Sequence, residues 1–536
     1  MNFFVNASMQ AQKSGIEHAQ LKRFELFNAN GEASRIVIRD WDPNLHLNTR
    51  AAGIPDRQLI SMFDYFQDAE QVEDHPIRLD DLDLGVLNTH TQPEPENSRT
   101  LIVAATGQLV ARVNLLPDMQ TVRSTELFDG YNNLYLVEHY DSRGFVSLQQ
   151  WYTPDNKIGT EIWLTPAGKP VLESFNRDDV RGNRQKSGWR LTDRDRTIWE
   201  FDTIEELTKH FLDDLNRDFW SLEKPNVFVL DRSHLAEWGL LYLDQPAYTV
   251  MHMHNAQTGN AQDPFDHVLN NNYEFALNAL DRYDAVVSAT HKQTRDIVRR
   301  FKPRAKPFTI PVGVVPNRLL NAERIQVAQR QFGKIVAFAR IAHEKHLDDL
   351  VRAVAIVQKG FPQVTLDLYG YPDPSDNYAA RRAIEKVVKA AHLEDVVTLK
   401  GYTNDIDQVE NSAMMFGVTS RMEGFNLAVM EAIAHGLIAF SYDVNYGPNE
   451  IVEDGVNGNV VPFNDYEAMA AAMLKVLRDP ALAQQYSTGA YDSAARYSEQ
   501  NVWTAWQKLL QDADAQWPVK LAANRSLTQP DEEGVR

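Results

Sequence analysis

The chain has 536 residues, of which 43% are hydrophobic and 24% charged, and it carries a formal net charge of −20 with no cysteine. This length is sufficient for two core domains and an additional one. The charge disfavours free nucleic acid as a partner, a polyanionic partner would need a local basic patch, and the lack of cysteine excludes disulfide bonds and thiolate metal sites.

The start of the chain has no targeting pattern. Residues 1–20 do not combine a basic start with an apolar run, so they do not resemble a signal peptide. No stretch of about 18 apolar residues occurs, which predicts no membrane span. We therefore expect a cytoplasmic protein with at most a peripheral membrane contact.

The first 75 residues alternate between strand and helix patterns. Apolar residues at 1–7 predict a strand, and the stretch after Gln12 predicts an amphipathic helix that ends near Asn28. Residues 35–38 and 59–67 then predict a second strand and a second helix. This alternation is typical of an α/β domain.

Three aspartates follow, at Asp80, Asp81 and Asp83. Carboxylates at this spacing could hold a cation such as Mn²⁺. No strand and helix of a nucleotide-binding unit surround them, so we interpret the cluster as a solvated turn and predict no metal ion there.

Between residues 84 and 205 the hydrophobic period changes to two, which predicts antiparallel strands. Turn sequences at 141–144, 154–157 and 166–169 separate them. The predicted strands are 100–104, 109–113, 135–140, 145–148 and 161–164. We expect a β insertion inside the first domain.

The end of this β segment is rich in basic side chains. They are Arg177, Arg181, Arg184, Lys186, Arg190, Arg194 and Arg196. Two interpretations stay open: a charged surface balanced by the interspersed aspartates, or a docking face for a phosphate-rich or otherwise acidic partner.

A second α/β half begins with a predicted helix at 204–217 and a strand at 225–230. The strand at 248–255 ends in His252 and His254, and histidines at a strand end can hydrogen-bond a ligand or move a proton. Their spacing also suits a metal pair, but no third ligand is evident. Trp238 lies upstream, and we interpret it as a core residue rather than part of a pocket.

Prolines at 303 and 307 and the stretch 310–313 predict a hinge before a second domain. The strand at 334–339 opens this domain, and Arg340 and Lys345 follow it. Two cations on the loop after a first strand are placed to bind a diphosphate and to neutralise charge on a leaving group.

The strand at 413–420, the turn at Gly424 and the helix at 427–434 form the most informative stretch. A helix start at the carboxyl end of a parallel strand offers free N–H groups to an anion. Glu423 precedes this helix and Glu431 lies within it, roughly 10 Å away. That separation suits two carboxylates that hold different parts of one long ligand, although taken alone the stretch could be an ordinary βα unit.

The pattern Ser-x-x-Glu-Gly-Phe-x-Leu-x-x-x-Glu-Ala-x-x-x-Gly at 420–436 resembles the signature of retaining GT-B glycosyltransferases of family 4. The chain resembles, over nearly its whole length, the subgroup that holds the bacterial poly(polyol-phosphate) α-glycosyltransferases of wall teichoic acid. The same subgroup holds the accessory-Sec glycosyltransferases of serine-rich adhesins.

The resemblance implies a GT-B fold, an α/β class with two Rossmann-like domains and an antiparallel β insertion in the first. The implied N-terminal acceptor domain spans 1–83 and 206–305, and the insertion spans 84–205. The nucleotide-sugar domain spans 306–485, a crossover helix spans 486–520, and a polar tail spans 521–536. We expect residues 526–536 to be disordered.

The resemblance also implies which residues form the site. It implies that a glycine loop from the first domain closes over the donor diphosphate. The implied catalytic residues are Glu423, His252, His254, Arg340 and Lys345, with His252 favoured over His254 for contact with the donor sugar. The implied donor-binding residues are Gly15, Ile16, Glu17, His18, Tyr402, Thr403, Gly424, Phe425, Asn426, Leu427 and Glu431.

The implied activity is retaining transfer of glucose or N-acetylglucosamine from a UDP-sugar. The acceptor is a hydroxyl of a serine/threonine-rich adhesin polypeptide or, as the alternative, poly(glycerol- or ribitol-phosphate) wall teichoic acid. The UDP-sugar is a substrate, and no cofactor or metal is expected. The insertion implies a homo-oligomer or a partner subunit.

Two other readings stay open. The first is a catalytically silent subunit that chaperones a partner, against which the joint presence of Glu423, Glu431, Arg340 and Lys345 argues. The second is a phosphorylase of related architecture, for which no cofactor or free-phosphate site is identified.

Overall fold

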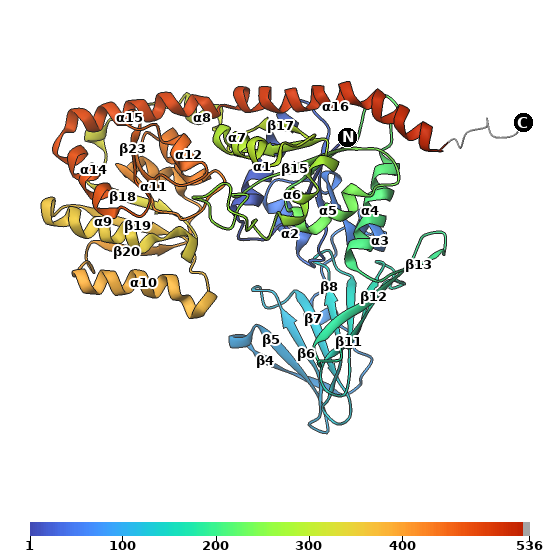
Figure 1. The fold of residues 1–536 in the computed structure, drawn as a ribbon. Coiled ribbons are helices and arrows are strands. Elements are labelled where there is room, and N and C mark those ends of the chain that lie inside the picture. Colours follow the sequence, from blue (N-terminus) through green and yellow to red (C-terminus); the bar gives the residue numbers. More distant parts are fainter. Residues whose placement is uncertain (529–536) are drawn as a thin grey trace, which may run out of the picture. The chain divides into compact units, whose positions relative to one another are not determined.

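A computed structural model describes residues 1–528, with side chains for residues 1–524. The chain forms two compact units (Figure 1). The first comprises residues 1–13 and 33–247 with the described residues from 520 on, and the second comprises residues 14–32 and 248–519.

The first unit contains four parallel strands in the order β14-β1-β2-β3. They are β1 (Asn2–Asn6), β2 (Ser34–Ile38), β3 (Leu59–Ser61) and β14 (Val227–Leu230). Its helices are α2 (Leu45–Ala51), α3 (Met62–Gln67), α4 (Ile204–Asp218) and α5 (Ser233–Leu241). Strands β1 and β14 are buried along their whole length, as parallel strands inside an α/β unit are.

The helix expected at 59–67 is shorter than its sequence predicts. Residues 59–61 form β3, which pairs with β2, and the helix starts only at Met62. Ser61 sets this start because its side chain accepts a hydrogen bond from the backbone of Asp64. Pairing with a neighbouring strand therefore overrides the local helical pattern.

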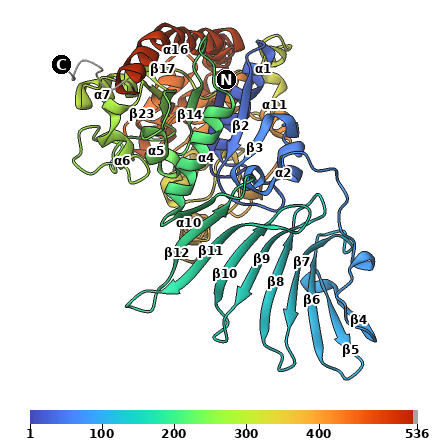
Figure 2. The same cartoon turned by 90° about the vertical axis from the view of Figure 1, so that its right-hand side faces the viewer.

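Ten antiparallel strands follow one another in chain order across a single sheet, from β4 to β13 (Figure 2). They are β4 (Thr89–Glu94), β5 (Arg99–Ala104), β6 (Leu109–Leu115), β7 (Val122–Phe128), β8 (Leu134–Tyr140), β9 (Val146–Tyr152), β10 (Ile158–Leu164), β11 (Pro170–Asp178), β12 (Arg184–Thr192) and β13 (Ile198–Phe201). The expected antiparallel insertion is thus present. Asp80, Asp81 and Asp83 are exposed at the short 3₁₀ helix Leu79–Asp81 before it.

The turn between β8 and β9 holds the sheet to α3. The side chain of Arg143 is 1% exposed, and its guanidinium donates to Asp141, to Asp64 at 3.0 Å and to the carbonyl of Ala69 at 2.6 Å. A buried cation is stable only when its N–H groups have such partners. Gly144 follows with φ +106°, and a Cβ there would lie 1.8 Å from the carbonyl oxygen of His75, so only glycine fits.

The second unit contains two sets of parallel strands. The first set is β15 (Tyr248–His252), β16 (Ala285–Ser288) and β17 (Lys306–Thr309), which pair in that order. Pro307, expected in a hinge, therefore lies in a strand. The second set is a six-stranded sheet in the order β20-β19-β18-β21-β22-β23.

Its strands are β18 (Lys334–Phe338), β19 (Thr365–Tyr369), β20 (Val397–Gly401), β21 (Met415–Val418), β22 (Ile438–Tyr442) and β23 (Gly458–Val461). The helices of this unit are α1 (Gly15–Ala29), α6 (Glu274–Asn278), α7 (His291–Phe301), α8 (Asn317–Leu320), α9 (Leu347–Gly360), α10 (Ser375–Ala391), α11 (Ile406–Ser412), α12 (Leu427–Ala434), α13 (Pro448–Ile451), α14 (Tyr466–Arg478), α15 (Pro480–Ala494) and α16 (Glu499–Thr528).

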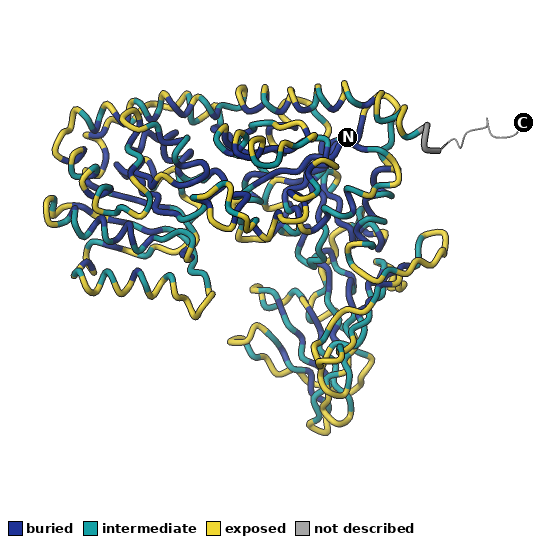
Figure 3. Tube along the Cα trace, in the orientation of Figure 1, coloured by how far each residue is buried: buried dark blue, intermediate teal, exposed yellow. Residues whose placement is uncertain are grey.

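Helices cover both faces of the six-stranded sheet. Alternate residues of β18 belong to separate cores: Ile335 packs with residues of α9 and α14, and Val336 packs with residues of α12 and α15. The buried strands are dark blue in Figure 3. Helix α9 contributes an apolar stripe to this packing: Leu347, Leu350, Val351, Val354 and Val357 are all buried.

The C-terminal region is largely helical, as expected, with one interruption. Helix α15 ends at Ala494 and α16 begins at Glu499, with a 3₁₀ turn between them. The rings of Trp503 and Trp506 pack edge-on against Phe27 of α1, and Asp512 accepts a hydrogen bond from Tyr248 of β15 at 2.6 Å. Helix α16 runs through residues 526–528, which we expected to be disordered, and the rest of the predicted tail, 529–536, lies outside the described residues.

None of the helices within residues 1–528 combines the length and the apolar content that crossing a bilayer requires.

Candidate functional site

Glu423 lies in the turn between β21 and α12, and its side chain is almost completely buried. Its Oε1 atom accepts hydrogen bonds from Lys345 Nζ at 2.7 Å, Ser420 Oγ at 2.7 Å and Asn426 Nδ2 at 3.1 Å. Three donors on one oxygen fix the carboxylate in a single orientation. Among the described residues no donor binds its Oε2, so this oxygen is the one available for a further contact.

The turn ends at Asn426, which begins α12. Its backbone is left-handed, with φ 76°, and its side chain accepts a hydrogen bond from the backbone of Val429 at 3.0 Å. This cap satisfies one of the free N–H groups of the helix start and leaves others at the turn.

Gly424 brings this turn against the loop that follows β15. A Cβ at Gly424 would lie 2.2 Å from the carbonyl oxygen of His254 and 2.7 Å from the nitrogen of Asn255. Both neighbours are backbone atoms, so any side chain would push the two segments apart. The histidine loop and the glutamate turn are therefore parts of one site.

The two expected diphosphate-binding cations lie on the loop after β18. Lys345 binds Glu423, as described above. Arg340 is about half exposed and donates to Asp373 at 2.6 Å and to Glu344 at 2.5 Å. An anionic ligand would compete with these two carboxylates for the guanidinium, whereas Lys345 has three N–H donors and can keep Glu423 while binding a second acceptor.

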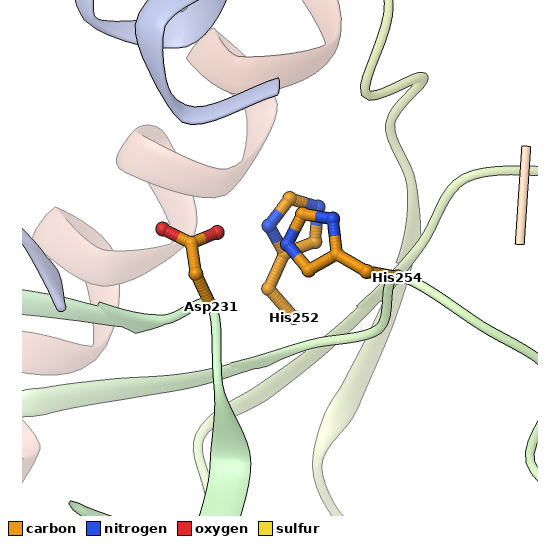
Figure 4. A group of neighbouring side chains, drawn as sticks. All are labelled: Asp231, His252 and His254. Carbon is orange, nitrogen blue, oxygen red and sulfur yellow. The ribbon is translucent and has the colours of Figure 1, made fainter. Parts of the chain in front are cut away.

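His252 and His254 lie close together, with ring centroids 4.4 Å apart (Figure 4). His252 is 1% exposed and packs edge-on against Trp506. Arg23 Nη1 forms a hydrogen bond of 2.9 Å with Nδ1 of His252. Because a guanidinium only donates, Nδ1 of His252 acts as the acceptor. His254 is partly exposed and is therefore the more accessible of the two histidines. The resemblance had favoured His252 for contact with the donor sugar.

Glu431 forms an ion pair with Lys22 of α1, with Oε1 and Nζ 2.9 Å apart. Both side chains line a pocket of about 460 Å³ in the second unit. Its other walls come from the segment after β17, the start of α11 and His435. Lys22, Arg318, Asn404 and Asp405 also line this pocket. The sequence did not single them out, because local helix and loop patterns do not show which distant residues share a pocket.

The remaining predicted donor contacts are less informative. Tyr402 is 41% exposed, and Thr403 accepts from the backbone of Asp405 at 3.1 Å. Neither lines the pocket beside Glu431, where residues 404–408 lie instead. Phe425 is buried against Tyr497, and Leu427 is partly buried in the core of α12.

Gly15 to His18 form the first turn of α1. Glu17 accepts a hydrogen bond from the backbone of Ser14 at 2.5 Å and forms a capping box with it. Ile16 and His18 are partly exposed. A Cβ at Gly15 would meet no atom within 4 Å, so nothing in the described chain itself requires a glycine at this position.

Glu410 and His435 form a buried acid–base pair behind the pocket, with His435 Nδ1 2.7 Å from Glu410 Oε2. Burial raises the pKa of the Glu410 carboxyl to about 7. Burial opposes the charged form of His435, but Glu410 raises the pKa of its imidazole above the usual value. Both groups therefore hold protons more strongly than they would in water.

A group near the start of α9 has metal-ligand chemistry. The ligand atoms of His346, Asp348 and Asp349 lie within 4.8 Å of one another. Arg352 donates to both aspartates, and Tyr442 donates to Asp349 at 2.9 Å. These carboxylates already have hydrogen-bond donors within the protein, and we interpret them as structural.

Two α/β sheets with parallel strands, an antiparallel insertion and a carboxylate turn at a helix start define the class of protein. It is a glycosyltransferase with the GT-B fold. The solved structure described as the pneumococcal O-GlcNAc transferase GtfA in complex with UDP and GlcNAc superposes with a TM-score of 0.80, at 21% identity, over 96% of this chain and 98% of that one.

Within the class, residues 322–493 match the family model described as glycosyl transferases group 1. The chain is 25% identical over 528 residues to the UDP-N-acetylglucosamine--peptide N-acetylglucosaminyltransferase GtfA subunit of Streptococcus gordonii, covering 95% of this chain and 98% of the relative. It is 22% identical over 525 residues to the poly(glycerol-phosphate) alpha-glucosyltransferase of Bacillus subtilis, covering 94% and 74%. The predicted fold class and the predicted resemblance are thereby confirmed.

Proposed function

We propose that the protein transfers glucose or N-acetylglucosamine from a UDP-sugar to an acceptor hydroxyl, with retention of the anomeric configuration. The observation that carries the proposal is the buried Glu423, oriented by Lys345 and followed at once by the free amides of a helix start. The two relatives support it because both are named for transfer of such a sugar.

In this proposal the diphosphate lies against Lys345, Arg340 and the start of α12, where the positive end of the helix dipole stabilises negative charge. Lys345 would bridge Glu423 and a phosphate oxygen. Glu423 and the amides of 424–426 would hold the sugar hydroxyls, and Glu431 would hold the ribose.

His254 is our choice for the second sugar contact. Gly424 allows its backbone to approach the glutamate turn, and its ring is partly exposed, whereas that of His252 is buried. Arg23 orients His252, whose ring in turn lies against that of His254. His252 would then act by positioning its neighbour.

Catalysis in this arrangement rests on positioning and on stabilising the leaving group. The acceptor hydroxyl attacks the anomeric carbon from the side that the diphosphate leaves. The acceptor oxygen forms the new bond, the bond to the diphosphate breaks, and a diphosphate oxygen takes the acceptor proton. No protein nucleophile is required.

The charges of the insertion bear on the acceptor. Several of its basic side chains are paired: Arg184 with Asp178 at 3.2 Å, Lys186 with Glu161 at 2.5 Å, and Arg194 with Glu70 at 3.2 Å. Such pairing lowers the positive potential that a phosphate polymer would need. We therefore propose a serine/threonine-rich polypeptide as the acceptor, with poly(glycerol- or ribitol-phosphate) as the alternative acceptor.

The relative from Streptococcus gordonii is named as a subunit. We accordingly propose that the chain works with a second subunit or a second copy, through its ten-stranded sheet.

Radiolabelled UDP-glucose and UDP-N-acetylglucosamine, each offered to a serine-rich polypeptide and to poly(glycerol phosphate), would test the proposal. We expect transfer to the polypeptide, an α-linkage by NMR, and transfer reduced by about 100-fold or more in Glu423→Gln. Transfer to the polymer alone would make the second acceptor the correct one. If no donor is transferred or hydrolysed, even with a partner subunit supplied, the silent-subunit reading replaces the proposal.

A further inference from the structure

A buried histidine forms part of the wall of the pocket beside Glu431. His435 directly follows the last residue of α12 and lines this pocket, yet its side chain is only 3% exposed. An imidazole buried to this extent cannot be a main contact of a ligand. Its effect on the pocket must instead pass through the groups that surround its ring, and the proposed function assigns it no role.

The ring of His435 joins three walls of the pocket. Its Nδ1 atom lies 2.7 Å from Glu410 Oε2 and 3.0 Å from the carbonyl oxygen of Glu431, and its Nε2 atom lies 3.3 Å from Asp407 Oδ1. Asp407 in turn accepts a hydrogen bond from Arg318 of α8 at 2.9 Å. Helices α8, α11 and α12 are therefore connected through this imidazole and its partners.

The charged groups that face this ring or its partners come from four helices and from the segment before β18. They are Lys22, Arg318, Arg330, Asp407, Glu410 and Glu431. Asp407 and Glu431 each pair with a permanent cation, Arg318 and Lys22 respectively. Arg330 donates to backbone carbonyl oxygens and to the hydroxyl of Tyr491 in α15. Among the described residues, the carboxylate of Glu410 forms an ion pair with His435 alone, and Glu410 is completely buried.

The charge of the Glu410–His435 pair changes near neutral pH. Burial raises the pKa of the Glu410 carboxyl to about 7. Burial opposes the charged form of the His435 imidazole, but Glu410 raises its pKa above the usual value. At about pH 5.5 the carboxyl is neutral and the imidazole is charged, so the pair is cationic, whereas at about pH 8.5 the ionised carboxyl makes the pair neutral or anionic. Salt screens buried charges weakly, so the pocket senses this change.

We propose that donor binding in this pocket is linked to protonation of the Glu410–His435 pair: an anionic nucleotide sugar binds the protonated pair more tightly, and its binding takes up a proton from the solvent. The two effects are one coupling, because linkage between two ligands is reciprocal. The identity of the ligand rests on the proposed function. His435 lies eight residues after the start of α12, where the diphosphate is placed, and this distance is roughly 12 Å. One unit of charge at that distance alters the affinity for a dianion about threefold to tenfold, at an effective dielectric constant of about 40–80.

Calorimetric titration of the full chain with UDP-glucose counts the proton directly. Both phosphates of UDP-glucose are esterified and stay fully ionised from about pH 5.5 to about 8.5, so a proton taken up on binding goes to the protein. Titrations at about pH 7 in buffers of different ionisation enthalpy give the number of protons. We expect an uptake of about 0.3 or more per donor bound in the wild-type chain, and less than about half of that in Glu410→Gln and in His435→Gln.

The pH dependence of donor affinity gives a sign that a structural role alone would not produce. Between about pH 5.5 and 8.5 the wild-type affinity for UDP-glucose should fall about threefold to tenfold. Glu410→Gln should match the wild type at the lower pH, where both side chains are neutral. At the higher pH it should bind the donor more tightly than the wild type, because only the wild type then carries the buried negative charge. Weaker binding at both pH values, or parallel pH profiles, would overturn the proposal.

His254→Gln is the matched control, because it removes a partly exposed histidine and keeps the buried pair. Proton uptake that persists in His254→Gln and is lost in Glu410→Gln and His435→Gln supports the proposal. Uptake that is lost in His254→Gln alone, or a wild-type affinity that does not change with pH, would overturn it and leave the proposed function standing. If neither UDP-glucose nor UDP-N-acetylglucosamine binds the wild-type chain at any pH, the proposed function fails together with the linkage.

Discussion

Lys345 Nζ lies 2.7 Å from Glu423 Oε1, so the loop after β18 and the turn after β21 are joined by an ion pair at the centre of the candidate site. The carboxylate is buried and the ammonium is about one-fifth exposed. The lysine therefore neutralises the glutamate before any ligand arrives, and it presents its remaining N–H groups where a diphosphate would bind.

Replacing either partner separates the chemical role of this pair from its structural one. Lys345→Met leaves Glu423 buried without its cation and should destabilise the protein by about 3–5 kcal/mol. Glu423→Gln keeps a group that Lys345 and Ser420 can bind, so its loss of stability should be smaller. Both should reduce transfer by about 100-fold or more, in steady-state assays with folding followed by thermal melting.

The double variant Lys345→Met with Glu423→Gln is the control. It removes the unpaired buried charge and should recover much of the stability lost in Lys345→Met, without recovering activity. Near-normal transfer by any of the three folded variants would contradict the proposed roles.

Gly424 is predicted to tolerate no side chain. In Gly424→Ala the new Cβ would lie 2.2 Å from the His254 carbonyl, and a contact between two backbone segments has no flexible atom that can yield. We expect a loss of transfer of about 100-fold, because a small displacement of the histidine loop misplaces the sugar. Circular dichroism should still report a folded chain. If Gly424→Ala transferred sugar at the wild-type rate, the close approach of the two segments would not be required for activity.

Gly15 offers the opposite case. A Cβ there meets nothing within 4 Å, and alanine at a compatible helical position stabilises by about 0.5–1 kcal/mol. We expect Gly15→Ala to melt at the same or a higher temperature but to raise the donor KM about tenfold, because the diphosphate would approach this backbone. An unchanged KM would remove Gly15 from the donor site.

Contiguous features of the site could be predicted from the sequence, whereas features that depend on distant parts of the chain could not. The β21–turn–α12 unit was predictable because its strand, its glycine and its helix are contiguous, and α12 spans 427–434 as its pattern indicates. The start of α3 could not be predicted, because residues 59–61 form β3 only through pairing with β2.

Side-chain partners at long range were equally hidden from the sequence. Lys22 is one of several polar residues on a helix, and only the fold places it 2.9 Å from Glu431. The accessibility of the two histidines also depends on packing, because His252 is buried by Arg23 and Trp506, which lie far away in the chain.

The Lys22–Glu431 pair leads to a prediction about donor affinity. Glu431→Gln should raise the donor KM about tenfold with little change in kcat, because ribose binding is the same in the ground state and the transition state. Lys22→Met should change thermal stability by less than about 1 kcal/mol, since both side chains are partly exposed. Calorimetric titration with UDP measures the first effect and thermal melting the second, and unchanged UDP affinity in Glu431→Gln would exclude the ribose role.

The pair of Glu410 and His435 predicts how stability depends on pH. Because the pKa of Glu410 is raised to about 7 in the folded chain, the folded state binds more protons than the unfolded state between about pH 4.5 and 7. The free energy of unfolding should therefore fall as pH rises through this window. His435 acts in the same direction, since its raised pKa gives stability that is present below about pH 6.5 and is lost at higher pH.

Glu410→Gln removes the buried acid and leaves His435 a hydrogen-bond partner. We expect the fall in unfolding free energy between pH 5 and 8 to be smaller in this variant by about 1–3 kcal/mol, measured by urea denaturation at each pH. Asp407→Asn, at an exposed carboxylate 3.3 Å from the other nitrogen of His435, is the matched control and should change the slope far less. Parallel pH profiles for wild type and Glu410→Gln would show that the buried carboxyl does not titrate in this range.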